Sequence, residues 1–151
     1  MRLLFAFLLF STALAGQSPT EIARWKATAE RVTIVRDRWG IPHIYGKTDA
    51  DVVFGLLYAQ CEDDFFRVEQ NYIEAIGRLA EVQGESALFH DIRARLFLDT
   101  VQAAAIYAES PAWMKKLLDA FADGMNYYLY THPQVKPKLL TRFQPAPHTP
   151  A

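Results

Sequence analysis

The chain has 151 residues, of which 51% are hydrophobic and 22% are charged, and its formal net charge is −1 at pH 7. This composition is typical of a globular protein with one hydrophobic core and excludes a disordered tail. The 16 basic and 17 acidic side chains leave no basic field for nucleic acid or for an anionic membrane. We therefore expect neither nucleic acid nor a membrane surface as a partner.

The first 15 residues have the layout of a secretory signal peptide. A positively charged start precedes an apolar run at residues 3–10, and Ala13 and Ala15 are the small residues before a cleavage point after Ala15. The run is too short to span a membrane, which takes about 20 residues. The sequence therefore predicts a signal peptide at residues 1–15, a mature segment at residues 16–151, and a periplasmic or secreted location.

Cys61 is the single cysteine, so an exported chain of this kind has no internal disulfide and must be stabilised by packing. Its neighbours Leu57 and Phe65 indicate the core face of a helix. A free cysteine in such a place is usually a small, inert hydrophobic residue. We predict an unreactive thiol.

A short helix and a β-hairpin are predicted after the leader. The helix runs through Ile22 and Trp25, and the β-branched run at residues 32–35 indicates a strand. A turn at residues 36–40 separates it from a second short strand at residues 43–45. These two strands are close enough along the chain to form a hairpin.

Helical periodicity follows from Thr48, which can cap the first long helix together with Asp49. Ser110 and Pro111 are predicted as the N-cap and first residue of the last helix. After Thr131 the prolines crowd together, which predicts an ordered connecting loop. The helical faces are marked, in chain order, by Val53, Leu56, Leu57 and Gln60, by Phe65, Val68, Tyr72, Ile76 and Leu79, by Leu88, Ile92 and Leu96, and by Met114, Leu117, Leu118, Phe121, Met125 and Tyr128.

No catalytic or metal-binding motif stands out from the residues alone. His43 follows the predicted turn and is expected to fix it by a hydrogen bond, and His132 and His148 are expected to be solvated loop residues. An acidic cluster has the density of a calcium site but lacks the spacing of an EF-hand loop, so a solvated helix face paired with Arg67 and Arg78 is the preferred interpretation. The cluster consists of Glu62, Asp63, Asp64 and Glu69.

Five segments in register resemble the penicillin acylase family, and the resemblance covers nearly the whole mature segment. Its departures from the family pattern include Leu57 before the tyrosine, Asp64 in place of a frequent arginine, and His148 where tryptophan is common. The matching segments are Arg36-Asp37 with Gly40-Ile41-Pro42-His43-Ile44, then Asp51 with Phe54, Tyr58 and Ala59, then Glu62-Asp63 with Phe65-Phe66 and Glu69, then Gly77-Arg78-Leu79-Ala80-Glu81 with Gly84, and Ala122-Asp123-Gly124-Met125-Asn126 followed by Phe143.

The resemblance implies an α+β fold, the N-terminal part of a four-layer αββα N-terminal-nucleophile hydrolase, of which this part is mostly helical with one short β-hairpin. In that family a precursor cuts itself into a small α and a large β subunit. The freed N-terminal serine of the large subunit attacks a linear amide, and its own α-amine, with an ordinary pKa of about 8, serves as the base. The implied partners are the large subunit and an N-acyl amide, such as a β-lactam with an amide side chain or an acyl-homoserine lactone.

No catalytic, substrate-binding or metal-binding residue of this chain follows from the resemblance, since the reacting groups belong to the large subunit. The chemistry is expected to need no cofactor, and a structural calcium ion is implied only for the full-length protein. We expect residues 16–151 to be an incomplete small subunit that is inactive and poorly folded alone. Two alternatives stay open at this point, a complete exported helical binding module and an inactive gene remnant.

Overall fold

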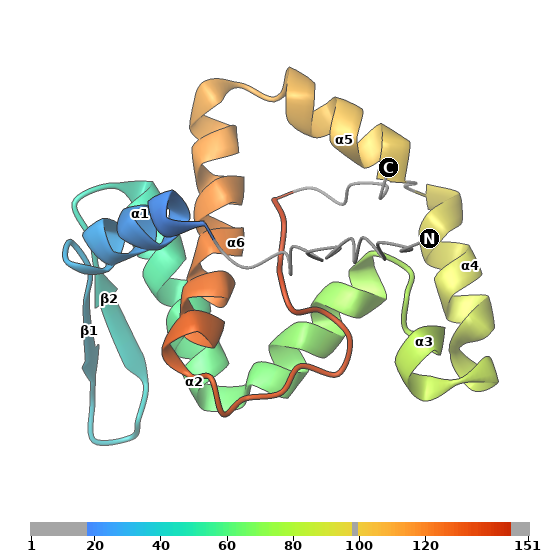
Figure 1. Cartoon of the computed structure of the whole chain (residues 1–151), viewed down its shortest axis with the longest axis horizontal. Helices are drawn as coiled ribbons and strands as arrows, with labels where there is room; N and C mark the ends of the chain where they lie inside the picture. Colours follow the sequence, from blue (N-terminus) through green and yellow to red (C-terminus); the bar gives the residue numbers. More distant parts are fainter. Residues whose placement is uncertain (1–17, 98–99, 146–151) are drawn as a thin grey trace, which may run out of the picture.

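The computed structural model describes residues 18–97 and 100–145, so the predicted signal peptide, its cleavage point and His148 lie outside the described residues. Figure 1 shows α2 and α6 at the centre, the hairpin on one side of them and α3 and α4 on the other. The predicted class is confirmed, with mostly helical structure and one short antiparallel hairpin. The elements are α1 (Pro19–Ala29), β1 (Thr33–Arg36), β2 (Pro42–Tyr45), α2 (Asp49–Ala75), α3 (Ala80–Gln83), the 3₁₀ turn η1 (Glu85–Ala87), α4 (Leu88–Phe97), α5 (Thr100–Glu109) and α6 (Ala112–Thr131).

Strands β1 and β2 pair with Ile34 opposite Ile44 and Val35 opposite His43. The inward pair, Ile34 and Ile44, is half-buried, whereas Val35 and His43 are exposed on the other face. Gly55 of α2 makes this approach possible, because a Cβ there would lie 2.8 Å from Cγ2 of Ile44. The hairpin therefore lies against α2 at a point where α2 has no side chain.

Helix α2 consists of two helical segments that meet at Asp64, next to Phe65, the first residue of the second predicted stripe. Asp64 has an extended backbone (φ −161°, ψ 82°), and its carboxylate accepts a hydrogen bond from the Arg67 amide at 3.1 Å. Asp64 thus caps the second segment in the way that an N-cap residue does. The second segment ends at Ala75, just before Gly77, which adopts a positive φ of 66°.

The main core lies between α2 and α6. The predicted faces are confirmed for Met125 and Tyr128 of α6 and for Phe65 of α2, whereas Phe121 of α6 is exposed and the first half of α2 was predicted partly wrong. Leu56 is 40% exposed and Gln60 is also exposed, while Phe54 is buried. The buried residues of this core are Leu57, Cys61, Phe65, Ala122, Met125, Tyr128 and Phe143.

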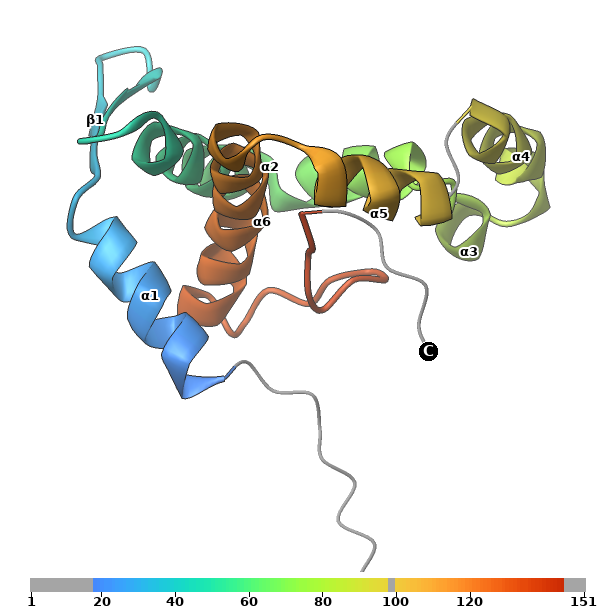
Figure 2. The same ribbon diagram turned by 90° about the horizontal axis from the view of Figure 1, so that it is seen from above.

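Helices α3 to α5 form an arm that leads away from this core and back to α6. Seen from above in Figure 2, α1 and α4 lie at opposite ends of the molecule. The predicted cap of the last helix was wrong in detail: Pro111 is the N-cap, and the Ser110 hydroxyl donates to the carbonyl of Ile106 at 2.7 Å. Ser110 therefore closes the end of α5. No helix within residues 18–97 and 100–145 has the length and apolarity needed to cross a membrane.

Replacing Gly124 by alanine is expected to separate α2 from α6. The new Cβ would lie 2.5 Å from the backbone oxygen of Phe54, which cannot swing aside. The overpacking costs about 3 kcal/mol and the better helix propensity of alanine returns about 1 kcal/mol, so the net loss of local stability is about 2 kcal/mol. Native-state hydrogen exchange should show α2 and α6 amides exchanging roughly 30-fold faster, whereas Gln70→Ala, at an exposed position of α2, should leave them unchanged. Unchanged exchange in Gly124→Ala would show that the contact is not tight.

Candidate functional site

The three described histidines contact neighbouring side chains, and His132 lies 3.0 Å from the Thr131 hydroxyl, which donates to backbone carbonyls at the end of α6. His43 is exposed, and its Nε2 lies 3.6 Å from Oδ2 of Asp37, too far for a hydrogen bond. His90 contacts Glu74 with Nε2 at 3.1 Å. His132 stacks on Tyr128 with ring centroids 4.2 Å apart and its Nδ1 lies 3.0 Å from the Tyr128 carbonyl oxygen, so the expectation of a solvated loop residue was wrong.

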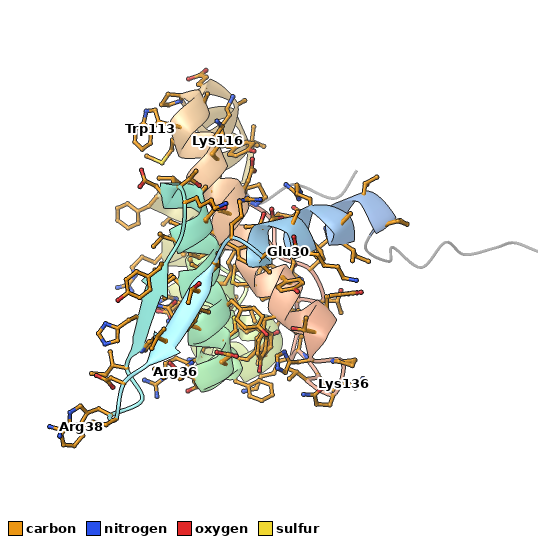
Figure 3. The ribbon with its side chains drawn as sticks, turned by 90° about the vertical axis from the view of Figure 1, so that its left-hand side faces the viewer. Glu30, Arg36, Arg38, Trp113, Lys116 and Lys136 are labelled. Atoms are coloured by element: carbon orange, nitrogen blue, oxygen red, sulfur yellow. The ribbon has the colours of Figure 1, made fainter. Side chains whose placement is uncertain are left out.

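The hairpin turn is fixed by Asp37 and not, as predicted, by His43. The Asp37 carboxylate accepts hydrogen bonds from the amides of Trp39 at 2.8 Å and Ile41 at 3.0 Å. The Ile41 amide is the largest influence that lowers the pKa of this carboxyl group. Gly40 supplies the positive φ of 80° that the turn requires. Figure 3 shows Arg38 at the free tip of the hairpin, far from Trp113 at the start of α6.

The acidic cluster of α2 divides between the surface and the core. Glu62 and Asp63 pair with Arg36 of β1 at 3.1 Å and 2.8 Å, and Asp64 pairs with Arg67, as the solvated-face interpretation predicts. Glu69 contradicts that interpretation because its side chain is fully buried. Arg78 also departs from it, since this side chain pairs with Glu81.

Glu69 holds the segment that follows α6. Its two carboxylate oxygens accept hydrogen bonds from three successive backbone amides, those of Lys138 at 3.0 Å, Leu139 at 2.9 Å and Leu140 at 3.2 Å. These bonds satisfy a buried carboxylate and three amides of an irregular segment at once. The predicted ordered loop is therefore confirmed over residues 132–145, and Glu69 is the residue that orders it.

Asn126 fastens the same segment to α6. Its amide nitrogen donates to the Phe143 carbonyl at 2.9 Å, and its amide oxygen accepts from the Phe143 N–H at 2.8 Å. The Tyr72 hydroxyl of α2 donates to the Gln144 carbonyl at 2.8 Å. Phe143 is 1% exposed, and its ring meets that of Tyr72 edge to face. The loop is thus bound from both central helices.

Asp123 fastens α1 to α6. Its Oδ1 accepts hydrogen bonds from the Trp25 indole at 2.7 Å and from Arg24 at 2.9 Å. Burial raises the pKa of the Asp123 carboxyl, and the Trp25 bond opposes that rise. The hollow beside it, of about 170 Å³, is polar, but Arg142 on its rim is already paired with Glu21. Two ion pairs, Arg24 with Asp123 and Arg142 with Glu21, thus lie beside this hollow, and Asp119 on its wall accepts a hydrogen bond from Tyr107.

The segment from Gly77 to Glu81 is fastened to α4 by Asp91. The buried Asp91 carboxylate accepts hydrogen bonds from the amides of Leu79 at 2.8 Å and Ala80 at 2.7 Å. Arg95, also in α4, donates to the Gly77 carbonyl at 2.9 Å. The backbone of this segment, which resembles the family pattern, is therefore held in place by α4.

Cys61 is buried, and burial raises the pKa of its thiol to about 12. A thiol in this environment stays protonated at physiological pH and is a poor nucleophile.

Two serine hydroxyl groups are engaged at helix ends. The Ser18 hydroxyl caps the start of α1, and the Ser110 hydroxyl donates to a carbonyl in the last turn of α5. Within the described part of the chain, no cluster of three or more His, Cys, Asp or Glu side chains is arranged to hold a metal ion.

Replacing Glu69 by glutamine is expected to release residues 138–140 locally. The NH₂ group of glutamine would face a backbone N–H group in place of a carboxylate oxygen, so at least one hydrogen bond would be lost. Loss of a buried hydrogen bond to a charged group destabilises the loop by about 1.5–3 kcal/mol. Hydrogen exchange at Lys138, Leu139 and Leu140 should then rise roughly tenfold or more. Glu62→Gln, on the same helix but at the surface, is the matched control and should leave these amides unchanged. Equal exchange rates of these three amides in both variants would show that Glu69 does not hold the loop.

The comparisons with known proteins agree with the predicted family. The sequence profile of the penicillin amidase family matches residues 31–151. Penicillin G acylase of Escherichia coli is 35% identical over 119 residues, which cover 78% of this chain and 13% of that protein. The acyl-homoserine lactone acylase QuiP of Pseudomonas aeruginosa strain PAO1 is 34% identical over 111 residues, 71% of this chain and 13% of that protein.

A solved structure gives the same result for the fold. Thermostable penicillin G acylase from Alcaligenes faecalis superposes with a TM-score of 0.62 and 25% sequence identity, covering 78% of this chain and 65% of that chain. The expected fold of an N-terminal-nucleophile hydrolase is thereby confirmed. The chain spans only about an eighth of the length of the curated relatives that it matches, 13% of each. On the family match and on these identities, the chain belongs to the penicillin amidase family of amide-cleaving acylases.

Proposed function

We propose that this chain is the N-terminal, small-subunit part of an exported, self-processing amidohydrolase that cleaves a linear amide in an N-acyl compound. The match to the penicillin amidase family over residues 31–151 is the observation that carries the proposal. The relatives named above act on penicillin G or on acyl-homoserine lactones. Both are compounds in which an amide joins an acyl group to a nitrogen atom, and this shared bond defines the proposed substrate class.

In this proposal the chain contributes scaffold and the reacting groups come from the large subunit. Hydrolysis of an amide needs a nucleophile, a base and donors for the oxyanion. Within the described residues the motif side chains are already engaged: Asp37 in the turn, Glu69 and Asn126 in the loop, and Asp123 with α1. Following the resemblance to the family, the proposal assigns the nucleophile to a serine that becomes a new N-terminus elsewhere in the full-length protein.

A binding module is the competing function, and one observation favours it. Large apolar side chains such as Trp39, Phe89 and Phe97 are 74–82% exposed, as they are at interaction surfaces. The same surface also fits a subunit that packs on a larger partner. The two functions differ in catalysis, since a module predicts no amide hydrolysis by the full-length protein.

The full-length protein, expressed from this chain together with its downstream reading frame, is expected to hydrolyse an N-acyl amide. A chromogenic phenylacetyl anilide and a series of acyl-homoserine lactones are suitable substrates, and released chromophore and free homoserine lactone are the readouts. The 151-residue chain alone should give no turnover above buffer. Turnover by that chain alone would place the nucleophile within it, and a full-length protein inactive on both substrate classes would favour the binding module.

Export is expected to remove residues 1–15. N-terminal sequencing of the protein from the periplasm or medium should begin at Gly16, because Ala13 and Ala15 give the small residues that signal peptidase requires. Ala15→Arg should keep the precursor uncleaved, whereas Gln17→Arg, beyond the cleavage point, should not. A cytoplasmic protein that retains Met1 to Ala15 would contradict the export proposal and leave the acylase proposal standing.

A further inference from the structure

Helix α4 has its polar side toward the rest of the protein and its apolar side outward. Leu88, Ile92 and Leu96 follow one another at four-residue spacing, so they lie along one side of the helix. Their exposed fractions are 45%, 47% and 80%. Phe89 and Phe97 are each 82% exposed. An amphipathic helix of a free-standing domain has the reverse arrangement, with its apolar side inward.

The inward side of α4 is held by polar contacts. Asp91 is buried and accepts two backbone amides from the start of α3. His90 contacts Glu74 of α2, and Arg95 donates to the Gly77 carbonyl. The orientation of α4 is therefore fixed by specific bonds, and a simple rotation that buries the apolar side would break them.

Helix α5, which follows α4 in the chain, also has exposed apolar side chains. Residues 101–108 contain no charged side chain, and Val101 and Ile106 are 67% and 58% exposed. Tyr107 bonds to Asp119 of α6 at 2.6 Å, which fixes the other side of α5. We define the outer apolar face as the exposed side chains of these two helices, namely Leu88, Phe89, Ile92, Leu96, Phe97, Val101 and Ile106.

We infer that the outer apolar face of α4 and α5 is the surface on which the larger, remaining part of the acylase polypeptide packs. This inference rests on the proposed function. The chain spans 13% of the length of its curated relatives, so most of such a protein is available to cover the face. Leu88 and Ile92 also line a hollow of about 230 Å³, whose other side is formed by Gly77, Glu81, Asp91 and Arg95.

Charge argues against an anionic lipid surface as the occupant. Helices that lie on such membranes carry many lysine or arginine residues beside the apolar side. Here α4 offers Arg93 and Arg95, of which Arg95 is engaged with Gly77, and residues 101–108 offer none. A neutral, broad apolar face instead fits the apolar centre of a stable subunit interface.

Thiol labelling of the full-length protein tests this directly. Cys61 is buried, so Leu96→Cys and Phe89→Cys place a new thiol on the outer apolar face, and Arg67→Cys places one at a side chain that is 79% exposed. With maleimide, and with the labelled peptides identified by mass spectrometry, the first two variants should react at least about tenfold more slowly than Arg67→Cys. All three should react alike in denaturant. Equal rates in the native protein would overturn the inference.

The other occupants give distinct results. Protection that disappears on dilution from micromolar to nanomolar protein would indicate a second copy, and protection found only with phosphatidylglycerol vesicles would indicate lipid; either would overturn the inference. If the cysteine variants fail to assemble, hydroxyl-radical footprinting of the unsubstituted protein measures the solvent accessibility of Phe89 and Phe97 directly. Amide hydrolysis by the same preparation is measured separately, so protection without hydrolysis would reject the proposed function while the docking surface stands.

Discussion

Helices α2 and α6 touch at Gly124, where α6 has no side chain, and the rest of the structure depends on this contact. The five residues from Ala122 to Asn126 divide the work of assembly between them. Ala122 and Met125 are buried in the core, and Gly124 admits the backbone of α2. Asp123 binds α1, and Asn126 binds the loop at Phe143. One turn and a half of helix therefore positions three other parts of the chain.

The order and type of the elements were predictable because they depend on local chemistry. Apolar spacing identified the helices, and it marked a second stripe from Phe65, next to the break that the structure has at Asp64. Details that depend on distant partners were not predictable. Glu69 reads as one more acid in a charged stretch, and its role needs the amides of residues 138–140, about 70 positions away. His132 and Ser110 were misjudged for the same reason, since their partners are set by the three-dimensional fold.

The residues that resemble the family pattern have structural partners in this chain. The segments that resemble the family contain carboxylates, an asparagine and a histidine, which are also the residue types of active sites. In the structure the Asp37 carboxylate closes a turn, Glu69 closes a loop and Asp123 joins two helices. A buried polar group without a partner costs several kcal/mol, so such residues are constrained strongly by folding alone. Family membership and catalytic function are thus separate conclusions for this chain.

The outer apolar face links this scaffold to its proposed function through stability. Burying a large aliphatic or aromatic side chain contributes roughly 1.5–3 kcal/mol. If a partner buries the seven partly exposed side chains of that face, the stabilising free energy is on the order of 10 kcal/mol. This equals the net stability of a whole domain, about 5–15 kcal/mol. Because polar bonds of Asp91 and Arg95 hold α4 with its apolar side outward, the chain cannot recover this free energy by itself. Folding of the arm and association with the proposed partner are therefore expected to be one coupled process.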